Sequence, residues 1–263
     1  MTQPPPLLTI AGSDSGGAAG LQADLKTWAT LGAYGMSAIT AVTAQNSRRV
    51  AAVHYLPPDF VAAQIDGVLS DYGAAAIKTG FIGRAALVEV IASRLAYWRA
   101  TLQPRPFVII DPVLVNHRHE PMFSPDVATA YRELLFPLAD LVTPNEPEAA
   151  LLGMTTDRSP PAAVDLARLG AARVLLKGLK FENEIADVFW DGRDVVLFSQ
   201  PAIDTINLHG SGDTLSAAIG AFLALGEDWP EAIRRAQRFT HAAITRGAGW
   251  RLGTGHGPLG YGS

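Results

Sequence analysis

The sequence predicts an α/β fold, a three-layer sandwich in which helices cover both faces of a mostly parallel central sheet. Short β-branched or apolar runs alternate with longer helical patterns along the 263 residues, which is the order of elements in βαβ units. Phe107–Asp111 (Phe-Val-Ile-Ile-Asp) is apolar almost throughout, as strands buried on both faces are. No repeat, low-complexity segment or linker divides the chain, so one domain is expected over residues 1–263.

In the first half of the chain, each expected strand is a short apolar or β-branched run followed by a helical pattern. The three strand–helix pairs are Leu7–Ala11 with Ala19–Leu31, Gly35–Val42 with Pro58–Ser70, and Ala75–Thr79 with Arg84–Trp98. Such pairs imply right-handed crossovers between parallel strands, so the helices should cover the sheet.

The second half continues the sheet and ends in two helices. After Phe107–Asp111, further strands are expected at Ala139–Val142, Arg173–Lys177, Asp187–Trp190 and Val195–Phe198. The Asp191-Gly192 step between the last two is typical of a hairpin turn, so that corner of the sheet should be antiparallel. Arg158-Ser-Pro-Pro is interpreted as a local turn before a helix. The closing helices are expected near Thr214–Leu225 and Trp229–Thr245.

Composition excludes several classes of function. The formal net charge is −4 and no basic run occurs, so the sequence has neither a nucleic-acid footprint nor a polybasic segment for a membrane surface. The absence of cysteine excludes disulfides, thiolate metal sites and cysteine nucleophiles. Neither a signal-peptide pattern nor an apolar run long enough to cross a bilayer is present. We therefore expect a soluble, cytoplasmic protein that acts on a small molecule.

The most informative segment is Asp204–Ile219, where two glycines bracket a serine and an aspartate opens a run of helix formers. This pattern predicts a loop that feeds a helix N-terminus, where free N–H groups and the helix dipole form an anion site. Gly210 and Gly212 would let the backbone approach a ligand closely. Asp213 would then be a base for a hydroxyl that attacks a phosphate. An equally weighted alternative is that Asp213 only caps the helix.

A glycine-rich loop, residues 12–20, follows the first expected strand. It matches neither the phosphate-loop pattern nor the dinucleotide-binding fingerprint. The loop contains Ser13, Asp14 and Ser15, and Asp24 follows where the next helix could aim it inward. A small polar substrate beneath a close backbone is slightly favoured over the alternative that the glycines only form a turn.

Polar residues also end three other expected strands. Asp111 ends a buried run, at a position that is costly in a core but useful in a cleft; a cap or local turn is the alternative. Asn145 and Glu148 lie three residues apart at a helix start and could order waters around Mg²⁺, although helix capping is the commoner use of this pair. For Lys177, a phosphate partner and a side chain that reaches the surface fit almost equally well.

Together these segments resemble the hydroxymethylpyrimidine/phosphomethylpyrimidine kinases of thiamine biosynthesis, within the ribokinase-like superfamily. The resemblance runs from about Leu8 to about Leu259, with the motifs in the order of the family. The most specific motifs are Ala11–Lys26, Ile39–Asn46, Ile77–Gly80, Asp111–Val113, Thr143–Ala149, Asp204–Ile219 and Leu252–Pro258.

The resemblance implies a ribokinase-like kinase domain that uses ATP and Mg²⁺ and forms a homodimer. It implies phosphoryl transfer to the hydroxymethyl group of 4-amino-5-hydroxymethyl-2-methylpyrimidine and then to its monophosphate. Gln45 corresponds to the residue that reads the aminopyrimidine edge, since a carboxamide offers a donor and an acceptor together. The other pyrimidine-pocket residues that the resemblance implies are Gly12, Asp24, Phe81 and Val113.

The resemblance also assigns residues to the nucleotide and to the transferring phosphoryl group. The residues that it places on the Mg·ATP side are Asp111, Asn145, Glu148 and Lys177, with Asp111 and Glu148 holding the metal through water. Those that it places at the phosphoryl anion hole are Gly210, Ser211, Gly212 and Asp213, with Asp213 as the catalytic base.

The chain departs from the family pattern at four places. Asp213 stands where most such pyrimidine kinases carry Cys, whereas aspartate is usual there in sugar kinases and many pyridoxal kinases. Phe81 replaces a usual Met, Val115–Glu120 replaces the usual flap sequence, and Leu208 replaces a usual Thr. Asp213 leaves a pyridoxine/pyridoxal kinase open as an alternative, although Gln45 and the Gly-His-Gly-Pro ending favour the pyrimidine. A non-catalytic ligand-binding relative is a second alternative.

Overall fold

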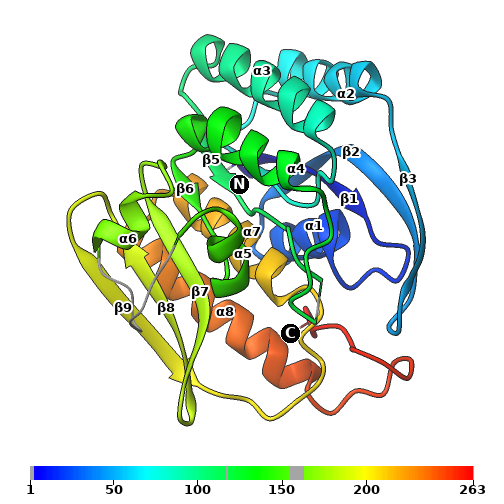
Figure 1. Ribbon diagram of the computed structural model, residues 1–263, viewed down its shortest axis with the longest axis vertical. Coiled ribbons are helices and arrows are strands. Elements are labelled where there is room, and N and C mark those ends of the chain that lie inside the picture. Colours follow the sequence, from blue (N-terminus) through cyan, green and yellow to red (C-terminus); the bar gives the residue numbers. More distant parts are fainter. Residues whose placement is uncertain (1–2, 117, 155–162, 263) are drawn as a thin grey trace.

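The predicted three-layer α/β sandwich is confirmed by the computed structural model, which describes residues 3–116, 118–154 and 163–262 (Figure 1). The described strands form a nine-stranded sheet in the order β3-β2-β1-β4-β5-β6-β7-β8-β9. Two predictions fall outside the described residues, namely the turn over residues 158–161 and the part of the flap at His117.

The centre of the sheet is parallel and its two sides end in antiparallel strands. The parallel strands are, in sheet order, β2 (Tyr34–Gln45), β1 (Pro6–Ser13), β4 (Ala76–Thr79), β5 (Phe107–Ile110), β6 (Leu141–Val142) and β7 (Val174–Phe181). The antiparallel strands are β3 (Val50–Tyr55) beside β2, then β8 (Glu184–Trp190) and β9 (Val195–Pro201) beyond β7. The antiparallel corner predicted at Asp191-Gly192 is therefore confirmed.

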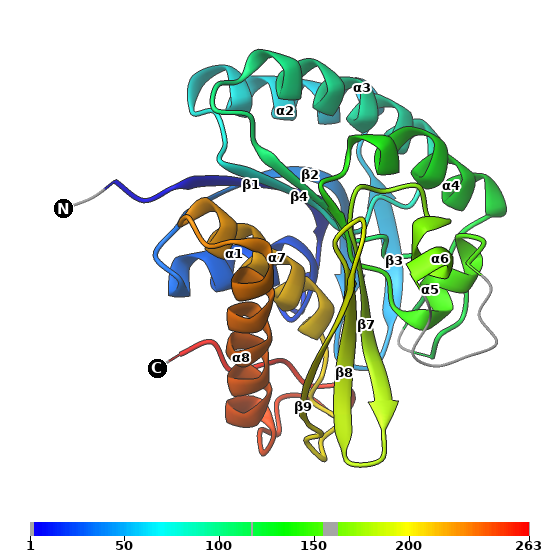
Figure 2. The same cartoon turned by 90° about the vertical axis from the view of Figure 1, so that its left-hand side faces the viewer.

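Helices cover both faces of this sheet, as Figure 2 shows. One face carries α2 (Pro58–Asp71), α3 (Ala85–Thr101), α4 (Pro125–Ala130), α5 (Glu146–Leu151) and α6 (Ala163–Ala167), with a π turn at Tyr131–Leu135 and a 3₁₀ turn at Phe136–Leu138. The other face carries α1 (Gly20–Thr30), α7 (Ser211–Ala224) and α8 (Trp229–Gly247). Within the described ranges, no helix combines the length and the apolar composition needed to cross a membrane.

Neighbouring residues of the central strands point into two different cores. Ile77 and Ile110 pack with α2 and α3, whereas Ala76 and Ile109 pack with α7 and α8. Because side chains alternate across a strand, a strand covered on both faces must be apolar at every position. This explains the unbroken apolar run that the sequence carries at β5. A charged residue within these strands is therefore costly unless a partner of opposite charge lies next to it.

The strand β3 was not predicted from the sequence. None of its residues is buried, so Val-Ala-Ala-Val-His-Tyr has no alternation of apolar and polar positions to indicate a strand. β3 is held by its antiparallel ladder with β2, which runs on to Gln45 instead of ending at Val42 as predicted. Backbone pairing at a sheet edge leaves little trace in a single sequence.

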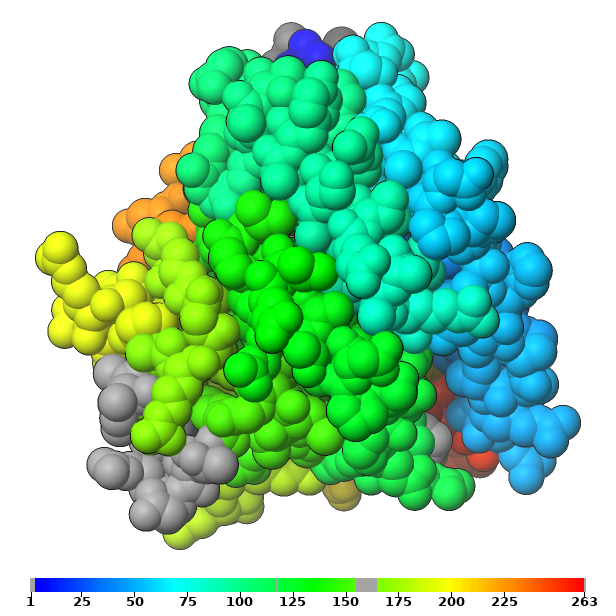
Figure 3. Space-filling view, turned by 45° about the horizontal axis from the view of Figure 1, so that its top comes forward, coloured from blue at the N-terminus to red at the C-terminus, as the bar shows by residue number. Residues whose placement is uncertain are grey.

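The turn between β2 and β3 contacts the C-terminal segment of the chain. The hydroxyl oxygen of Ser47 accepts hydrogen bonds from the amides of Thr254 and Gly255, and its carbonyl accepts one from His256 at 2.9 Å. In the space-filling view of Figure 3, red atoms of the C-terminal segment are visible beside the blue atoms of the β2–β3 region. Two of the motifs that carry the family resemblance, Ile39–Asn46 and Leu252–Pro258, are thereby brought close together.

Two glycine-to-alanine substitutions should change stability in opposite directions. A Cβ at Gly35 would lie 2.8 Å from Leu25 and 2.9 Å from Trp28, so Gly35→Ala should lower the free energy of unfolding by about 1–3 kcal/mol. A Cβ at Gly67, within α2, meets nothing within 4 Å, so Gly67→Ala should raise it by about 0.5–1 kcal/mol. Urea denaturation measures both, and equal effects of the two changes would contradict this packing.

Candidate active site

The carboxyl ends of the parallel strands meet the N-terminus of α7 at one edge of the sheet. From β1 the chain passes to β2 on one side and later to β4 on the other, and ligands bind beside such a reversal of strand order in open α/β sheets. Most of the predicted site residues lie at or just beyond the ends of these strands or at the start of α7, and Asp24 lies within α1. The fold therefore brings together residues from most of the length of the chain.

The start of α7 is an open set of backbone donors. Gly210 is the N-cap with φ +87°, and a Cβ there would lie 2.0 Å from the carbonyl oxygen of Ala18, so only glycine fits. Ser211 donates its amide to Leu208. Across the described part of the chain, the amides of Gly212 and Asp213 meet no protein acceptor. Two free amides at the positive end of a 14-residue helix make this helix start a candidate anion site.

Asp213 does not cap the helix, so the capping alternative for this residue is wrong and its role as a base stays a prediction. The cap position belongs to Gly210, and no side chain accepts a cap hydrogen bond there. Instead, Oδ1 of Asp213 lies 2.9 Å from Nζ of Lys78, and Oδ2 accepts the amide of Gly20 at 3.0 Å. The side chain of Asp213 keeps 13% of its surface exposed, so a ligand at the α7 N-terminus can reach it.

Lys78 is the site residue that the sequence analysis missed. It lies in the middle of β4, its side chain is 1% exposed, and its Nζ bridges Asp213 and Asp24 at 2.9 and 2.6 Å. The second oxygen of Asp24 accepts the hydroxyl of Thr9 at 2.6 Å. A signal was present, because Ala-Ile-Lys-Thr places one charge in a strand too short to leave the core.

Asp24 has a different place from the one implied by the resemblance. Its side chain has no exposed surface, so in this structure it lies beneath the pocket and pairs with Lys78 and Thr9 instead of forming an open pocket wall. The expectation that the helix aims Asp24 inward is correct. Its effect on a ligand would pass through Lys78 and Asp213.

The three charges of this cluster titrate far from their ordinary values. Burial raises the pKa of Asp24 to about 7, against the lowering effect of Lys78. Burial would also raise the pKa of Asp213, but the Lys78 charge and the hydrogen bonds from Lys78 and Gly20 bring it below its usual value. Burial acts to lower the pKa of Lys78, and the two carboxylates reverse this and raise it. Lys78 is therefore a fixed cation and Asp213 a fixed anion at neutral pH.

A second buried ion pair lies on the other side of the α7 N-terminus. Nζ of Lys177 contacts Oδ1 of Asp111 at 2.5 Å, and the hydroxyl of Ser216 donates to Oδ2 of Asp111 at 3.0 Å. A Cβ on Gly212 would lie 3.2 Å from Nζ of Lys177, so this cation faces the free amides. The alternative that Lys177 reaches the surface is wrong, since its side chain is only 13% exposed.

Asn145 and Glu148 form the capping box that was the commoner reading of their spacing. Each side chain accepts the other's backbone amide at 2.9 Å at the start of α5. Glu148 is nevertheless 3% exposed, and burial raises its pKa to about 7, against the effect of Lys177 and with that of Asp111. Glu148 is thus both a structural cap and a member of the charge cluster around Lys177.

The glycine-rich loop is folded around Asp14. The carboxylate of Asp14 accepts the amides of Gly16, Ala18 and Ala19 at 2.7 to 3.0 Å, and Nε2 of His209 lies 3.6 Å from it. Burial would raise the pKa of Asp14, but His209 and these hydrogen bonds lower it to about 2. The carboxylate of Asp14 is therefore used by the loop itself, and binding of a substrate by this loop stays a prediction.

The remaining predicted pocket residues line the same region. Nε2 of Gln45 lies 3.0 Å from Nε2 of His209, which comes from the loop before α7. A Cβ on Gly12 would lie 2.9 Å from the ring of Phe81, so the backbone of Gly12 packs directly on that ring. Phe81 also packs against Tyr55 and Phe123, with ring centroids 6.1 and 5.4 Å apart.

Val113 is half-buried just beyond β5, and its amide donates to the carbonyl of Asp111 at 3.0 Å. Val113 therefore lies two residues after Asp111, whose carboxylate binds Lys177. Its contact with a substrate stays a prediction.

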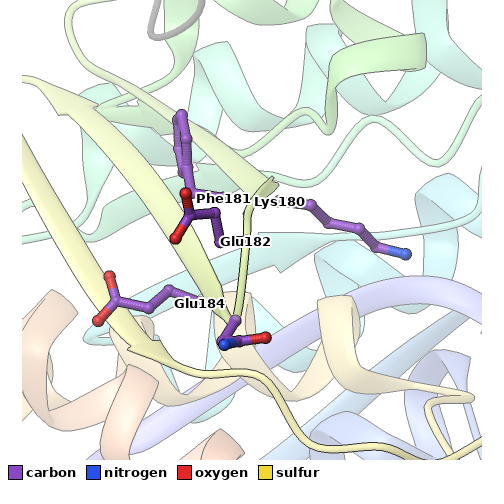
Figure 4. Close-up of a pocket in the computed structure, with 5 residues that line it drawn as sticks. Lys180, Phe181, Glu182 and Glu184 are labelled. Atoms are coloured by element: carbon purple, nitrogen blue, oxygen red, sulfur yellow. The ribbon is translucent and has the colours of Figure 1, made fainter.

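A separate open hollow of about 590 Å³ lies at the turn between β7 and β8 (Figure 4). It is lined by Lys180, Phe181, Glu182, Asn183 and Glu184. In Figure 4 the side chains of Lys180 and Glu184 point to opposite sides, and all five residues belong to one hairpin. Groups that converge on a ligand occur at the α7 N-terminus, and we place the candidate site there.

The fold, the anion site and the adjoining carboxylate define a ribokinase-like ATP-dependent phosphotransferase. Comparison with known proteins agrees, since the family model described as phosphomethylpyrimidine kinase matches residues 14–260. The chain belongs to the phosphomethylpyrimidine kinase family.

Relatives in sequence are similar over nearly the whole chain. The hydroxymethylpyrimidine/phosphomethylpyrimidine kinase of Rhizobium meliloti is 43% identical over 96% of this chain and 95% of its own length. The thiamine biosynthesis bifunctional protein of Geobacter sulfurreducens is 44% identical over 96% of this chain, but the match spans only 51% of that longer protein.

Solved structures include both kinds of vitamin kinase. An ADP complex of Bacillus subtilis pyridoxal kinase superposes with a TM-score of 0.87 at 35% identity, covering 98% of each chain. A phosphomethylpyrimidine kinase from Clostridium difficile superposes with a TM-score of 0.76 at 33% identity, covering 91% of this chain and 99% of that one.

Removal of the buried cation should destabilise the chain in a pH-dependent way. Lys78→Met leaves Asp24 and Asp213 without their partner and should lower the free energy of unfolding by about 3–5 kcal/mol. The folded-state pKa of Asp24 would then rise further above its unfolded value, so the loss should be larger at pH 8 than at pH 6. Adding Asp24→Asn should recover part of it. Urea denaturation at both pH values is the measurement, and a pH-independent loss would contradict the cluster.

Proposed function

We propose that this chain transfers the γ-phosphoryl group of ATP to the hydroxymethyl group of 4-amino-5-hydroxymethyl-2-methylpyrimidine, and then phosphorylates the monophosphate. The observation that carries the proposal is the accessible carboxylate of Asp213 beside the free amides of Gly212 and Asp213. A base and an anion site within one helical turn suit a hydroxyl that attacks a phosphoryl group. Membership of the phosphomethylpyrimidine kinase family supports the choice of substrate.

Asp213 would orient the substrate hydroxyl and accept its proton. The lowered pKa keeps the carboxylate ionised, so it is ready to accept a hydrogen bond from the hydroxyl. The same low pKa makes it a weak base in the ground state. Proton transfer is therefore expected late, once bonding to phosphorus has acidified the attacking oxygen. Lys78 and Gly20 hold the two carboxylate oxygens in place throughout.

The transferring phosphoryl group would lie on the amides of Gly212 and Asp213. Negative charge on its oxygens is stabilised there by the N–H groups and the helix dipole. Lys177 faces the same point, given its closeness to Gly212, and supplies a full positive charge. Asp111 and Ser216 keep that ammonium group in position.

Mg²⁺ fits the donors on this side of the site only with water and phosphate as further ligands. Over the described residues, no three His, Asp or Glu side chains converge as a metal cage. Asp111 and Glu148 are two carboxylates at one charge cluster, which suits an ion that keeps several waters and binds nucleotide phosphates. When bound, Mg²⁺ would neutralise phosphate charge during transfer. The capping bond between Asn145 and Glu148 would hold Glu148 toward the ion.

The pyrimidine would be recognised by the amide of Gln45 and by the ring of Phe81. The contact between Gln45 and His209 occupies one side of that amide and leaves other donor and acceptor positions for an aminopyrimidine edge. The backbone of Gly12 lies against Phe81, and Val113 would close the pocket beyond β5. Asp24 would contribute indirectly, because it holds Lys78, which in turn contacts Asp213.

Pyridoxal kinase activity is the second candidate function. It is favoured by the high TM-score with the Bacillus subtilis pyridoxal kinase and by aspartate at position 213. Both substrates carry a hydroxymethyl group on an aromatic nitrogen ring, so the phosphoryl-transfer groups would serve either. The two functions differ only at the edge of the ring that Gln45 would read.

We further propose that the chain works as a homodimer without a nucleic-acid partner. The homodimer rests on the resemblance to the family, and the lack of a nucleic-acid partner rests on the net charge of −4. Analytical ultracentrifugation would test the first, and a single sedimenting species of 27.9 kDa would contradict it.

Parallel turnover assays should separate the two substrates. With ATP and Mg²⁺, we expect the pyrimidine alcohol to give the monophosphate and then the diphosphate, with kcat/KM at least about tenfold above that for pyridoxal. Mass spectrometry of the products measures both steps. A preference for pyridoxal would refute the pyrimidine assignment. Binding of either alcohol without turnover would instead support a non-catalytic relative.

Replacing the proposed base should reduce the rate more than the binding. Asp213→Asn should lower kcat by about 10²–10⁴, because an amide cannot accept the hydroxyl proton. The dissociation constant of the pyrimidine, from calorimetry, should change by less than about threefold. Asp71→Asn, the same substitution at an exposed residue where α2 ends, is the matched control and should leave kcat unchanged. Full activity of Asp213→Asn would show that the base is another group.

A further inference from the structure

Asp187 is a buried carboxylate outside the two ion pairs of the site. It lies in β8 with 5% exposure, and no lysine or arginine in the described residues is within ion-pair distance of it. Burial raises its pKa, against hydrogen bonds from Gly178 and Gln237 and the charge of Lys177. A carboxylate buried without a cationic partner lowers stability unless its hydrogen bonds compensate.

The strand opposite Asp187 contains a bulge at Lys177. Leu176 pairs with Val188 and Leu179 pairs with Ala186, so Lys177 and Gly178 together stand opposite Asp187 alone. Gly178 has φ +78°, a conformation that side chains other than glycine rarely adopt. β-Bulges of this kind re-aim a side chain and are common beside active sites.

The bulge lets Lys177 face the active site while the strand remains packed on the core. Leu176 and Leu179 both lie in the same core, on the face of the sheet that carries α5 and α6, although three positions separate them. In a regular strand, Leu179 would share the face of Lys177, because side chains alternate. The extra residue therefore allows Leu179 to be buried and Lys177 to reach Asp111.

Asp187 holds this bulge in place. Its Oδ1 accepts the amide of Gly178 at 2.8 Å, the donor next to Lys177 that the bulge disturbs. Its Oδ2 accepts Nε2 of Gln237 from α8 at 2.6 Å, and that nitrogen also lies 3.3 Å from the carbonyl oxygen of Phe198 in β9. The carboxylate thus connects the bulge in β7 to α8 and β9, two elements remote from the substrates.

We propose that Asp187 is a positioning residue for phosphoryl transfer, which acts by fixing the Gly178 bulge and so holding the Lys177 ammonium group at the anion site. This inference rests on the proposed role of Lys177 toward the nucleotide. It does not depend on which alcohol is phosphorylated. The backbone of Lys177 is held from the opposite side as well, since its amide donates to Pro144 at 2.9 Å.

Nucleotide affinity, measured without any alcohol present, tests this role. Asp187→Ala removes the acceptor for Gly178 and should weaken ATP binding by about tenfold in calorimetry with Mg·ATP. Asp187→Asn keeps an oxygen for Gly178 and should stay within about threefold of the wild type. Val188→Ala, on the same strand, removes core contacts without touching the bulge. It should lower stability but leave ATP affinity unchanged.

A double-mutant cycle distinguishes positioning from a general structural effect. If Asp187 acts through Lys177, then Asp187→Ala should weaken ATP binding no further in a chain that already carries Lys177→Met. Gly178→Ala disfavours the bulge conformation and should cause the same loss of ATP affinity without changing Asp187. It replaces Asp187→Ala in the test if that variant does not fold. The wild-type affinity for the pyrimidine should be retained in all of these variants.

Three outcomes would overturn the inference. They are ATP affinity within twofold of wild type in Asp187→Ala, additive effects in the double variant, or an equal loss in Asp187→Asn and Asp187→Ala. If instead Lys177→Met itself binds ATP normally, the nucleotide role of Lys177 fails. Turnover of the pyrimidine alcohol would show separately whether the proposed function stands.

Discussion

The constraint on which this site depends is the burial of the Lys78 ammonium group within β4. A buried cation is tolerated only when opposite charges are brought to it, and here Asp24 from α1 and Asp213 from α7 supply them. One ion therefore joins a central strand to two helices that lie far apart in the sequence. The same contact lowers the pKa of Asp213 and places its carboxylate beside the free amides of α7. The cluster of Lys78, Asp24 and Asp213 thus both stabilises the fold and positions the proposed base.

A second buried lysine repeats this arrangement across the start of α7. Lys177 is neutralised by Asp111 and, through space, by Glu148, as Lys78 is by Asp24 and Asp213. The two lysines therefore flank a helix end that already attracts anions. Lys78 is enclosed and contacts the proposed base, Asp213, whereas Lys177 lies beside Gly212, where the proposed role is to bind phosphate. The division of labour follows from which partners surround each ammonium group.

The fold was predictable because apolar runs and helical patterns alternate with little ambiguity, and β3 was missed because an exposed edge strand has no such pattern. Of the site, the strand-end residues Asp111 and Lys177 could be located, but the surface alternative for Lys177 could be excluded only by its contact with Asp111. Lys78 was missed because its meaning depends on two carboxylates 54 and 135 positions away. Asp213 illustrates the same limit. A cap and a base look alike in a sequence, and only the structure, in which Gly210 holds the cap position, excludes the cap.

The central claim is that Asp213, held by Lys78, meets the substrate hydroxyl beside the phosphoryl site at the start of α7. A crystal structure with the pyrimidine alcohol, Mg²⁺ and a non-hydrolysable ATP analogue tests it most directly. The account predicts the hydroxymethyl oxygen at hydrogen-bond distance from the Asp213 carboxylate, roughly 2.6–3.2 Å, with the γ-phosphate on the Gly212 and Asp213 amides. A hydroxyl bound away from Asp213, or a γ-phosphate bound away from those amides, would contradict it.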